Sequence, residues 1–290
     1  MKILVTGSAG QLAGKIRELS GTTNELKFIF ASKDKLDITN TSELHRFFTG
    51  EKIDILINCA AYTNVDGAES AYQQANKVNN FAVKEISRLS ETYNFIFVHI
   101  STDYVFDGSK GRPYKEKDKT NPLGAYGKSK SDGEVSIMEN NCRSIIIRTS
   151  WLYSNLGSNF VKNIINLAQE KESIEVVDDQ LGSPTSAKDL SQAIMHMIRS
   201  NMFIEASLKK EIFHFCNSGV CSWYELAKEI VKIKKLDCKI IPCKSTEFKT
   251  VAKRPFYSAL NNEKFSSSFS FEIRKWQEAL EISLQETNLN

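Results

Sequence analysis

Short apolar runs alternate with amphipathic stretches through the first half of the chain. Runs rich in β-branched and aromatic residues predict strands at residues 3–6, 26–31, 53–59, 95–100 and 144–148. Helical spacing of apolar positions predicts helices at residues 12–19, 42–48, 71–92 and 126–139. Strands that alternate with helices indicate a parallel sheet covered on both faces. We therefore predict an α/β fold built on a Rossmann-type, doubly wound parallel sheet.

The second half of the chain is less regular. Helical spacing recurs at residues 160–169 and 223–233, and strand-like runs lie at 174–177 and 211–216. Loops with Gly and Pro interrupt the pattern at 182–184 and 253–255, and the serine-rich run 266–270 reads as a turn. We predict a dinucleotide-binding domain at residues 1–155. Residues 156–290 are predicted to form a smaller, mainly substrate-binding part, with some segments returning to pack on the first domain.

The composition is that of an ordinary globular protein. Of 290 residues, 41% are hydrophobic and 25% charged, and the formal net charge is +3. Basic residues do not concentrate in one block, which argues against nucleic acid as a partner. No apolar run approaches the roughly 20 residues of a membrane helix, and Met1 to Thr6 is a short β-rich run unlike a signal peptide. We expect a cytoplasmic protein that does not engage a membrane.

The chain has six cysteines, which makes a metal site one possibility. Cys216 and Cys221 share their spacing with Cys238 and Cys243, so a zinc site is an alternative. Zinc pairs usually come with tighter loops or with histidines nearby. Cys59 and Cys216 lie in apolar, strand-like runs, where cysteine behaves as a small hydrophobic residue. We expect free thiols in a reducing compartment and predict no metal site.

A glycine-rich loop follows the first predicted strand. Gly7 suits a tight turn, and Gly10 lets the backbone approach a phosphate at the start of the next helix. Free N–H groups and the helix dipole favour anions at that position. Ala13 occupies the close helix–strand packing position of dinucleotide-binding loops, which accepts Ala as well as Gly. The loop predicts a site for a dinucleotide pyrophosphate.

The end of the second predicted strand bears on the choice of cofactor. An acidic residue there would accept the ribose 2′-hydroxyl of NAD, but this chain has Ser32 and Lys33. Lys33 is able to pair with a 2′-phosphate, which favours NADPH. NADH stays an alternative, because a merely solvated lysine fits the same pattern. Asp37, followed by Ile38, offers a carboxylate to the adenine amino group.

Tyr126 and Lys130 lie four residues apart in a predicted helix and therefore share one face. A neighbouring lysine stabilises a phenolate and lowers the pKa of the phenol, which makes tyrosine a better proton donor near neutrality. Ser101 and Thr102 end the fourth predicted strand, and parallel sheets bind ligands beyond these strand ends. A hydroxyl there is placed to bind the substrate oxygen that Tyr126 protonates.

Several longer motifs carry a resemblance that spans nearly the whole chain. They are Gly7-Ser-Ala-Gly10-Gln-Leu, Asn58-Cys-Ala-Ala-Tyr-Thr-Asn-Val-Asp66, Ser101-Thr-Asp-Tyr-Val-Phe-Asp-Gly108, Tyr126-Gly-Lys-Ser-Lys130, Arg148-Thr-Ser-Trp151, Asp179-Gln-Leu-Gly-Ser-Pro-Thr185, Ser222-Trp-Tyr224 and Arg254-Pro255. With these motifs the sequence resembles the dTDP-4-dehydrorhamnose reductase family of extended short-chain dehydrogenases/reductases. The resemblance implies that NADPH or NADH reduces the 4-keto group of a nucleotide-linked deoxysugar, in dTDP-rhamnose biosynthesis.

The resemblance also assigns roles to residues. It implies that Thr102, Tyr126 and Lys130 form the catalytic set, with Tyr126 as proton donor. It implies further cofactor contacts at Gln11, Leu12, Asp37, Ile38, Ala61, Tyr62, Thr63, Tyr126 and Lys130. Its substrate positions are Val65, Thr102, Asp103, Tyr104 and Trp151, with Arg254 placed to meet the nucleotide phosphates. A core role for Trp151 and a solvated loop position for Arg254 are the alternatives.

One departure from the family concerns metal. Some members hold magnesium at a dimer contact, with acidic residues on the first helix and before a later helix. Here Lys15 and Lys188-Asp189 occupy those positions, and lysines oppose a hard cation. We therefore expect no metal-dependent dimer and leave monomer and homodimer both open.

Other functions are carried by the same fold. Sugar-nucleotide 4,6-dehydratases need an extra acid and base, in the pattern Thr-Asp-Glu, whereas this chain has Thr102-Asp103-Tyr104. An epimerase or a reductase of another nucleotide-linked 4-ketosugar stays an alternative. So does a non-catalytic NAD(P)-binding regulatory subunit, as in methionine adenosyltransferase, although an intact Thr, Tyr and Lys set favours an enzyme.

Overall fold

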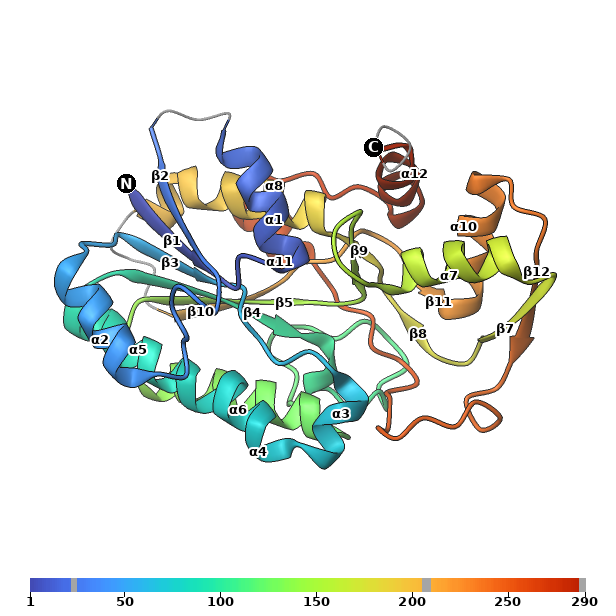
Figure 1. Ribbon diagram of the computed structural model, residues 1–290, viewed down its shortest axis with the longest axis horizontal. Coiled ribbons are helices and arrows are strands. Elements are labelled where there is room, and N and C mark those ends of the chain that lie inside the picture. The colour runs from blue at the N-terminus through green and yellow to red at the C-terminus, as the bar shows by residue number, and fades with distance from the viewer. Residues whose placement is uncertain (22–24, 205–209, 287–290) are drawn as a thin grey trace.

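Six parallel strands form the central sheet (Figure 1). The computed structural model describes residues 1–21, 25–204 and 210–286. The strands are β1 (Lys2–Thr6), β2 (Lys27–Ala31), β3 (Ile55–Asn58), β4 (Ile96–Thr102), β5 (Ser144–Thr149) and β10 (Lys210–His214). Their order is β10-β5-β4-β3-β1-β2, which reverses between β1 and β3. This order confirms the predicted doubly wound sheet, and such sheets bind ligands beyond the carboxyl strand ends at the reversal.

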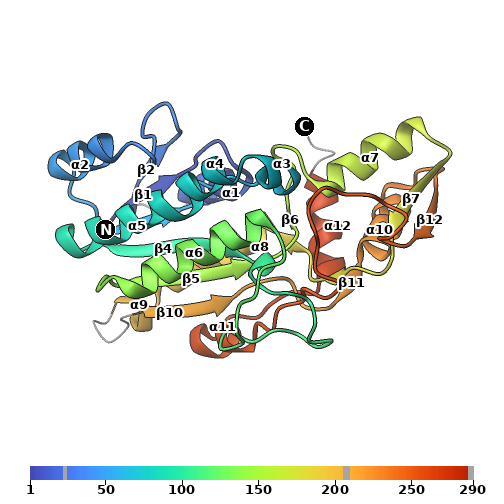
Figure 2. The ribbon, with the colours of Figure 1, turned by 90° about the horizontal axis from the view of Figure 1, so that it is seen from below.

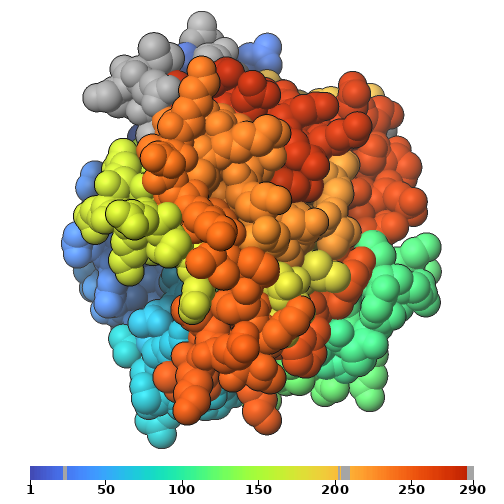
Figure 3. Space-filling model, turned by 90° about the vertical axis from the view of Figure 1, so that its right-hand side faces the viewer, coloured from blue at the N-terminus to red at the C-terminus, as the bar shows by residue number. Residues whose placement is uncertain are grey.

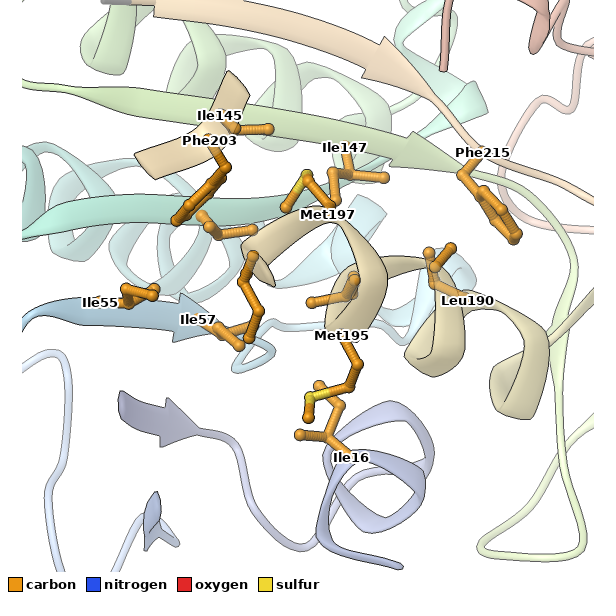
Figure 4. Close-up of a cluster of buried hydrophobic side chains, with 14 of the residues drawn as sticks. Ile16, Ile55, Ile57, Ile145, Ile147, Leu190, Met195, Met197, Phe203 and Phe215 are labelled. Carbon is orange, nitrogen blue, oxygen red and sulfur yellow. The ribbon is translucent and has the colours of Figure 1, made fainter. Parts of the chain in front are cut away.

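Helices cover both faces of the sheet (Figures 1 and 2). One layer contains α1 (Gln11–Ser20), α8 (Ala187–Arg199) and α11 (Glu263–Phe269), and the other contains α2 (Thr41–Gly50), α5 (Ala82–Tyr93) and α6 (Ala125–Glu139). Ile3 and Val5 of β1 join the first layer and Leu4 the second, because side chains alternate along a strand. Figure 4 shows the first layer, where Ile16 of α1 meets Met195 of α8.

The long helix predicted over residues 71–92 is broken into three pieces. α4 (Tyr72–Asn76) leads into a π-helical turn, η1 (Lys77–Phe81), and then into α5. The short helix α3 (Val65–Ser70) precedes them. Hydrophobic spacing indicates a helix but does not reveal the extra residue of a π turn. The π turn buries Asn79 and leaves Lys77 exposed.

The second half of the chain builds a smaller part beside the carboxyl edge of the sheet. Its core contains α7 (Phe160–Glu170), α10 (Trp223–Lys234), α12 (Trp276–Glu286) and the parallel pair β7 (Ser173–Val177) and β12 (Lys239–Cys243). Short strand pairs join β6 (Leu152–Tyr153) to β9 (Thr185–Ser186) and β8 (Leu181–Gly182) to β11 (Cys221–Ser222). Two further short helices are η2 (Asp103–Val105) and α9 (Asn201–Ile204).

Segments of the second half also return to the central sheet. β10 pairs with β5 at the sheet edge, and α8 and α11 cover one sheet face. The prediction of a turn at residues 266–270 was wrong, because most of the run lies in α11, where Phe265 and Phe269 pack on the sheet. The intervening serines hid the spacing of these two rings. In the described part of the chain, no helix is both long and apolar enough to span a membrane.

Candidate active site

A cavity of about 980 Å³ lies beyond the carboxyl ends of β1, β3, β4 and β5. The predicted site residues that line it are Gly7, Gly10, Gln11, Leu12, Lys33, Asp37, Ile38, Ala61, Tyr62, Thr63, Thr102, Asp103, Tyr126, Lys130 and Trp151. The predicted residues outside its lining are Ser32, Val65, Tyr104 and Arg254. The fold therefore brings the predicted phosphate loop and the predicted catalytic set into one cavity.

The backbone of the loop after β1 shapes the cavity next to α1. Gly7 has a φ of +66°, and a Cβ there would lie 2.6 Å from the backbone of the loop after β3. Gly10 caps α1 without a side-chain hydrogen bond, which leaves the N–H groups of the first helical turn available to an anion. The side-chain oxygen of Gln11 accepts hydrogen bonds from Ser154 (3.0 Å) and Asn159 (2.9 Å). The loop therefore fits a dinucleotide pyrophosphate.

Positive charge gathers where the cavity passes the end of β2. Lys33 and Lys77 both line the cavity, and both are exposed. Although burial opposes the change, hydrogen bonds from Thr39 and the charges of Lys33 and Lys77 lower the pKa of Asp37. Ser32 instead stabilises the turn, since its carbonyl accepts two backbone N–H groups at 3.0 Å. The cavity end near β2 therefore fits a ribose phosphate, and the Asp37 carboxylate is left for the adenine amino group.

Tyr126 and Thr102 meet at the end of β4. Burial raises the pKa of Tyr126 to about 12, although a hydrogen bond with Thr102 acts in the opposite direction. The Thr102 hydroxyl also donates to Asp103 Oδ1 (3.1 Å) and accepts from the Tyr104 N–H (3.2 Å). α6 approaches closely because Gly127 has no Cβ, which would lie 2.1 Å from the Tyr104 carbonyl oxygen. The fold thus brings a phenol and a hydroxyl to one point of the cavity.

Lys130 contacts the strand below α6. Its Nζ donates to the Ile100 carbonyl at 2.6 Å and lies 3.1 Å from His99 Nε2. Lys130 is not among the groups that shift the pKa of Tyr126. The prediction that Lys130 lowers this pKa is therefore wrong for the structure as it stands: burial disfavours the phenolate, and the lysine is held against β4.

Two buried oxygens at the ends of β4 and β5 have no hydrogen-bond partner within the described residues. They are Asp103 Oδ2 and Thr149 Oγ1, and both residues line the cavity. Burial raises the pKa of Asp103 to about 7, against hydrogen bonds with Ser258 and Thr102. Because buried polar groups are normally paired, these two atoms fit a ligand that carries hydroxyl groups.

Aromatic rings line the cavity on the side of the C-terminal part. The rings of Trp151 and Trp223 are stacked with centroids 3.5 Å apart, and Phe160 lies 4.5 Å from Trp223. Trp151 has a φ of +48°, an unusual conformation for a bulky residue. Its ring also packs on Gly182, where a Cβ would come within 2.5 Å. Packing and backbone together fix the Trp151 ring at the cavity wall.

Arg254 binds a carboxylate beside the cavity. Its guanidinium makes a bidentate ion pair with Asp66, at 2.7 and 3.1 Å, next to Val65 at the start of α3. It also hydrogen-bonds the side chain of Tyr104, whose ring meets the Tyr126 ring edge to face. This ion pair joins the loop after β12 to the first half of the chain, and Figure 3 shows the orange segment against the cyan one. Tyr104 thus links Arg254 to Tyr126, through a hydrogen bond on one side and a ring contact on the other.

The positions considered for metal are held by other contacts. All six cysteines are free thiols, and among the described residues no group of three or more His, Cys, Asp or Glu side chains is placed to hold an ion. Lys15 pairs with Glu18 at 2.8 Å. Asp189 accepts from Arg274 and Asn217, both at 2.6 Å, so a cation already compensates its charge. The expectation that the chain binds no metal stays a prediction.

A single family covers this chain from end to end. The model of the RmlD substrate binding domain matches residues 1–289. The chain belongs to the RmlD family. This finding confirms the resemblance that the motifs carry.

Proteins similar to this RmlD-family chain match it over nearly their full length. The spore coat polysaccharide biosynthesis protein SpsK of Bacillus subtilis (strain 168) is 37% identical over 98% of this chain and 97% of that protein. The crystal structure of a dTDP-4-dehydrorhamnose reductase from Clostridium acetobutylicum is 38% identical, with a TM-score of 0.93 over 99% of this chain and 100% of that one. The dTDP-4-dehydrorhamnose reductase of Bacillus anthracis, in complex with NADP, is 36% identical, with a TM-score of 0.90 over 98% and 99%.

Some residues of this RmlD-family site escaped the sequence argument. Lys77 and Asn79 lie in the π turn. The amphipathic pattern of this run indicates a helix but does not mark either residue as part of a site. The Asn79 side chain holds both backbone groups of Tyr62, at 2.9 and 3.0 Å, and donates to Ser129 of α6 at 3.0 Å. It thereby braces the loop after β3 against the helix that carries Tyr126. Trp223 had a signal in its motif, but only the fold places it on Trp151.

Proposed function

We propose that this RmlD-family protein reduces the 4-keto group of a nucleotide-linked deoxysugar with NADPH, and that its substrate is dTDP-4-dehydro-L-rhamnose, giving dTDP-L-rhamnose. Two solved structures that are 38% and 36% identical carry the name dTDP-4-dehydrorhamnose reductase, which supports the substrate. Domain roles follow from the same proposal: residues 1–155 bind the cofactor, and residues 156–290 mainly cover the sugar nucleotide.

The observation that carries the proposal is the meeting of Thr102 and Tyr126 in the cavity that also holds the phosphate loop. The cofactor, when bound, supplies the hydride for the ketone carbon. Tyr126 gives its phenolic proton to the ketone oxygen, and its raised pKa keeps that proton in place until the oxygen becomes basic. Thr102 positions the same oxygen through its hydroxyl. Lys130 provides the cationic group for the reacting end once it leaves β4.

The choice of NADPH rests on Lys33 and Lys77. Both line the cavity, and the charges of both lower the pKa of Asp37, so the two ammonium groups act on the same region of the cavity. A 2′-phosphate would meet two cations there, whereas a ribose 2′-hydroxyl would meet no acidic residue at the end of β2. NADH stays usable, because the pyrophosphate loop does not discriminate between the two cofactors. The NADP complex of the Bacillus anthracis protein agrees with this preference.

The substrate is assigned to the remaining lining. Asp103 Oδ2, which has no partner within the described residues, is available to a sugar hydroxyl. The Trp151 ring at the cavity wall offers an apolar surface for the sugar. Val65 and Tyr104 lie outside the cavity lining, where the Tyr104 ring contacts the Tyr126 ring, and are proposed as further substrate positions. Arg254, outside the cavity lining, is the proposed contact for the nucleotide phosphates, and its ion pair with Asp66 orients the guanidinium.

The test is to incubate the protein with NADPH and dTDP-4-dehydro-L-rhamnose and to follow the loss of reduced-nicotinamide absorbance. Product identity by mass and sugar analysis separates reduction from epimerisation. Oxidation of NADPH that depends on the sugar nucleotide is expected. Cofactor binding without turnover of any nucleotide-linked 4-ketosugar would point instead to the regulatory-subunit alternative.

A further inference from the structure

A row of buried polar side chains crosses the sheet beneath α6. Thr6, Asn58 and His99 are register neighbours on β1, β3 and β4, so their side chains leave the same sheet face. Lys130 of α6 ends the row. The contacts are Thr6 Oγ1 to Asn58 Oδ1 at 2.6 Å, Asn58 Nδ2 to His99 Nδ1 at 3.1 Å, and His99 Nε2 to Lys130 Nζ at 3.1 Å. Each residue is at most 2% exposed, so these contacts decide where the protons lie.

The amide of Asn58 fixes the tautomer of His99. The backbone N–H of Ala60 donates to Asn58 Oδ1 at 3.2 Å, and a backbone donor cannot be reversed. The Thr6 hydroxyl donates to the same oxygen. The amide nitrogen Nδ2 must therefore point to His99 and donate to its Nδ1. A ring nitrogen that accepts a hydrogen bond carries no proton, so the proton of the neutral imidazole lies on Nε2.

This tautomer constrains the protonation of Lys130. The His99 Nε2–H points at Lys130 Nζ, and an ammonium group has three N–H donors and no acceptor. Two donors facing each other at 3.1 Å would repel. A neutral amine resolves the conflict, because it accepts from Nε2–H while one of its own hydrogens goes to the Ile100 carbonyl at 2.6 Å.

We propose that His99 is a positioning residue whose Nε2–H holds the neutral amine of Lys130 against β4, and that Lys130 takes up a proton from water only when it leaves this contact to face cofactor and substrate. The proposal rests on the proposed reductase function, in which a cationic Lys130 serves the reacting end. His99 and Lys130 would then form a resting position that couples the charge of Lys130 to its movement.

Burial favours the neutral amine of Lys130, whereas the neighbouring acidic groups oppose it. Burial lowers the pKa of Lys130 to about 8, against the opposing effects of Glu134 and Cys59. Burial, and then the charge of Lys130, lower the pKa of His99 well below its ordinary value. Glu134 on α6 is paired with Arg148 of β5 at 2.6 Å, and Cys59 follows β3. These are the titratable and charged groups that act on Lys130 from the elements packed around it.

The first experiment reads the tautomer without any turnover. Long-range ¹H–¹⁵N spectra of the full-length, cofactor-free protein would be recorded from about pH 6 to 9, with the exposed His45 as internal reference. The His99 signals are assigned by their loss in His99→Gln. We expect a proton on Nε2, a bare Nδ1, and no titration of this ring. A proton on Nδ1, or a ring that becomes cationic in this range, would overturn the proposal.

The second experiment reverses the tautomer. In Asn58→Asp the new carboxylate still accepts hydrogen bonds from the Ala60 N–H and the Thr6 hydroxyl, but it also accepts one from His99 Nδ1–H. The ring proton then lies on Nδ1, which leaves Nε2 as an acceptor for an ammonium. Lys130 should then stay charged to higher pH. We expect the alkaline fall of kcat/KM to move upward by roughly half to one pH unit, the size of a typical buried hydrogen bond. His99→Gln should shift it in the same direction, since its amide oxygen can accept from Lys130.

His45→Gln is the matched control, because this histidine is exposed on α2 and pairs with Glu85 away from the cavity. Its pH profile should equal that of the wild type. An unchanged alkaline limb in both Asn58→Asp and His99→Gln would contradict the role of His99. If the wild type turned over no sugar nucleotide, the reductase proposal would fail, while the tautomer would still decide whether His99 holds a neutral Lys130. The spectra use His99→Gln only to assign the His99 signals, so the tautomer itself is read in the wild-type protein.

Discussion

The two ends of the cavity are built by different means. Near β2, the site consists of glycine backbone and exposed lysines, with Gly7 and Lys33 as examples. Near β4, it consists of buried side chains that hydrogen-bond one another, with Tyr126, Thr102 and Asp103 at the centre. Charge in the first region is screened by water, whereas in the second it is governed by desolvation. Substitutions near β2 should therefore change cofactor binding, and substitutions near β4 should change turnover.

Tyr126→Phe is expected to have the largest effect, because it removes the proton donor and leaves the buried ring in place. General acid catalysis contributes roughly 10²–10⁴-fold in rate, and kcat should fall by about that factor. The dissociation constant of NADPH, measured by fluorescence, should change little. This split between kcat and binding would sharpen the contrast between the two ends.

Tyr93→Phe is the control for the loss of a phenol. This tyrosine is exposed at the end of α5, and its hydroxyl contacts only Thr49 among the described side chains. Its kcat should match the wild type. If Tyr126→Phe kept more than about half of the wild-type turnover, Tyr126 would not be the acid.

Gly7→Ala should act mainly on cofactor binding. The left-handed backbone costs a residue with a Cβ about 1–2 kcal/mol, and the added carbon would lie 2.6 Å from the loop after β3. We expect a lower free energy of unfolding and a dissociation constant of NADPH raised by roughly tenfold or more. Urea unfolding and fluorescence titration measure the two quantities.

Gly50→Ala is the matched control for Gly7→Ala. Gly50 is helical at the end of α2, and a Cβ there meets nothing within 4 Å among the described residues. Ala is favoured over Gly in helices, so stability should be equal or higher. A Gly7→Ala protein with unchanged NADPH binding would remove the loop after β1 from the cofactor site.

The sequence predicted the first half of this molecule better than the second, and the reason is the range of the contacts. Gly7 and Gly10 act through local backbone conformation, which short motifs encode. Lys130 lines the cavity, but its contact with His99 depends on the register of β4 beneath α6. Spacing along one helix says nothing about such a neighbour. The expected effect of Lys130 on Tyr126 failed for this reason.

The second half shows the same limit in its packing. Trp151 stacks on Trp223, which lies in a distant segment of the chain. The sequence shows two tryptophans but not that their rings are in contact. The pair between Arg254 and Asp66 likewise spans most of the chain. The serine-rich run was predicted to be a turn because its serines separate Phe265 from Phe269, the two phenylalanines that α11 buries. The motifs named the individual residues as candidates, and only the fold showed which of them touch.

Lys33→Ala tests the screened end directly. Loss of one ammonium should lower kcat/KM for NADPH by up to about tenfold, since an exposed charge is worth little more than 1 kcal/mol. The value for NADH should change less, because NADH lacks the 2′-phosphate. Lys77→Ala should behave alike, and Lys35→Ala, an exposed neighbour outside the cavity lining, should leave both values unchanged. A wild-type preference for NADH would show that these lysines do not select the cofactor.

The smallest effect is expected from removing metal, which tests a region away from both ends of the cavity. Lys15 lies buried on α1 and pairs with Glu18, and the Asp189 carboxylate on α8 is already bound by Arg274 and Asn217. Magnesium prefers carboxylates that are free to coordinate it, and nearby cations repel it. EDTA should therefore change neither activity nor the molecular mass found by light scattering. Loss of activity that magnesium restores would reveal a site elsewhere, and a mass that halves with EDTA would identify a metal-linked dimer.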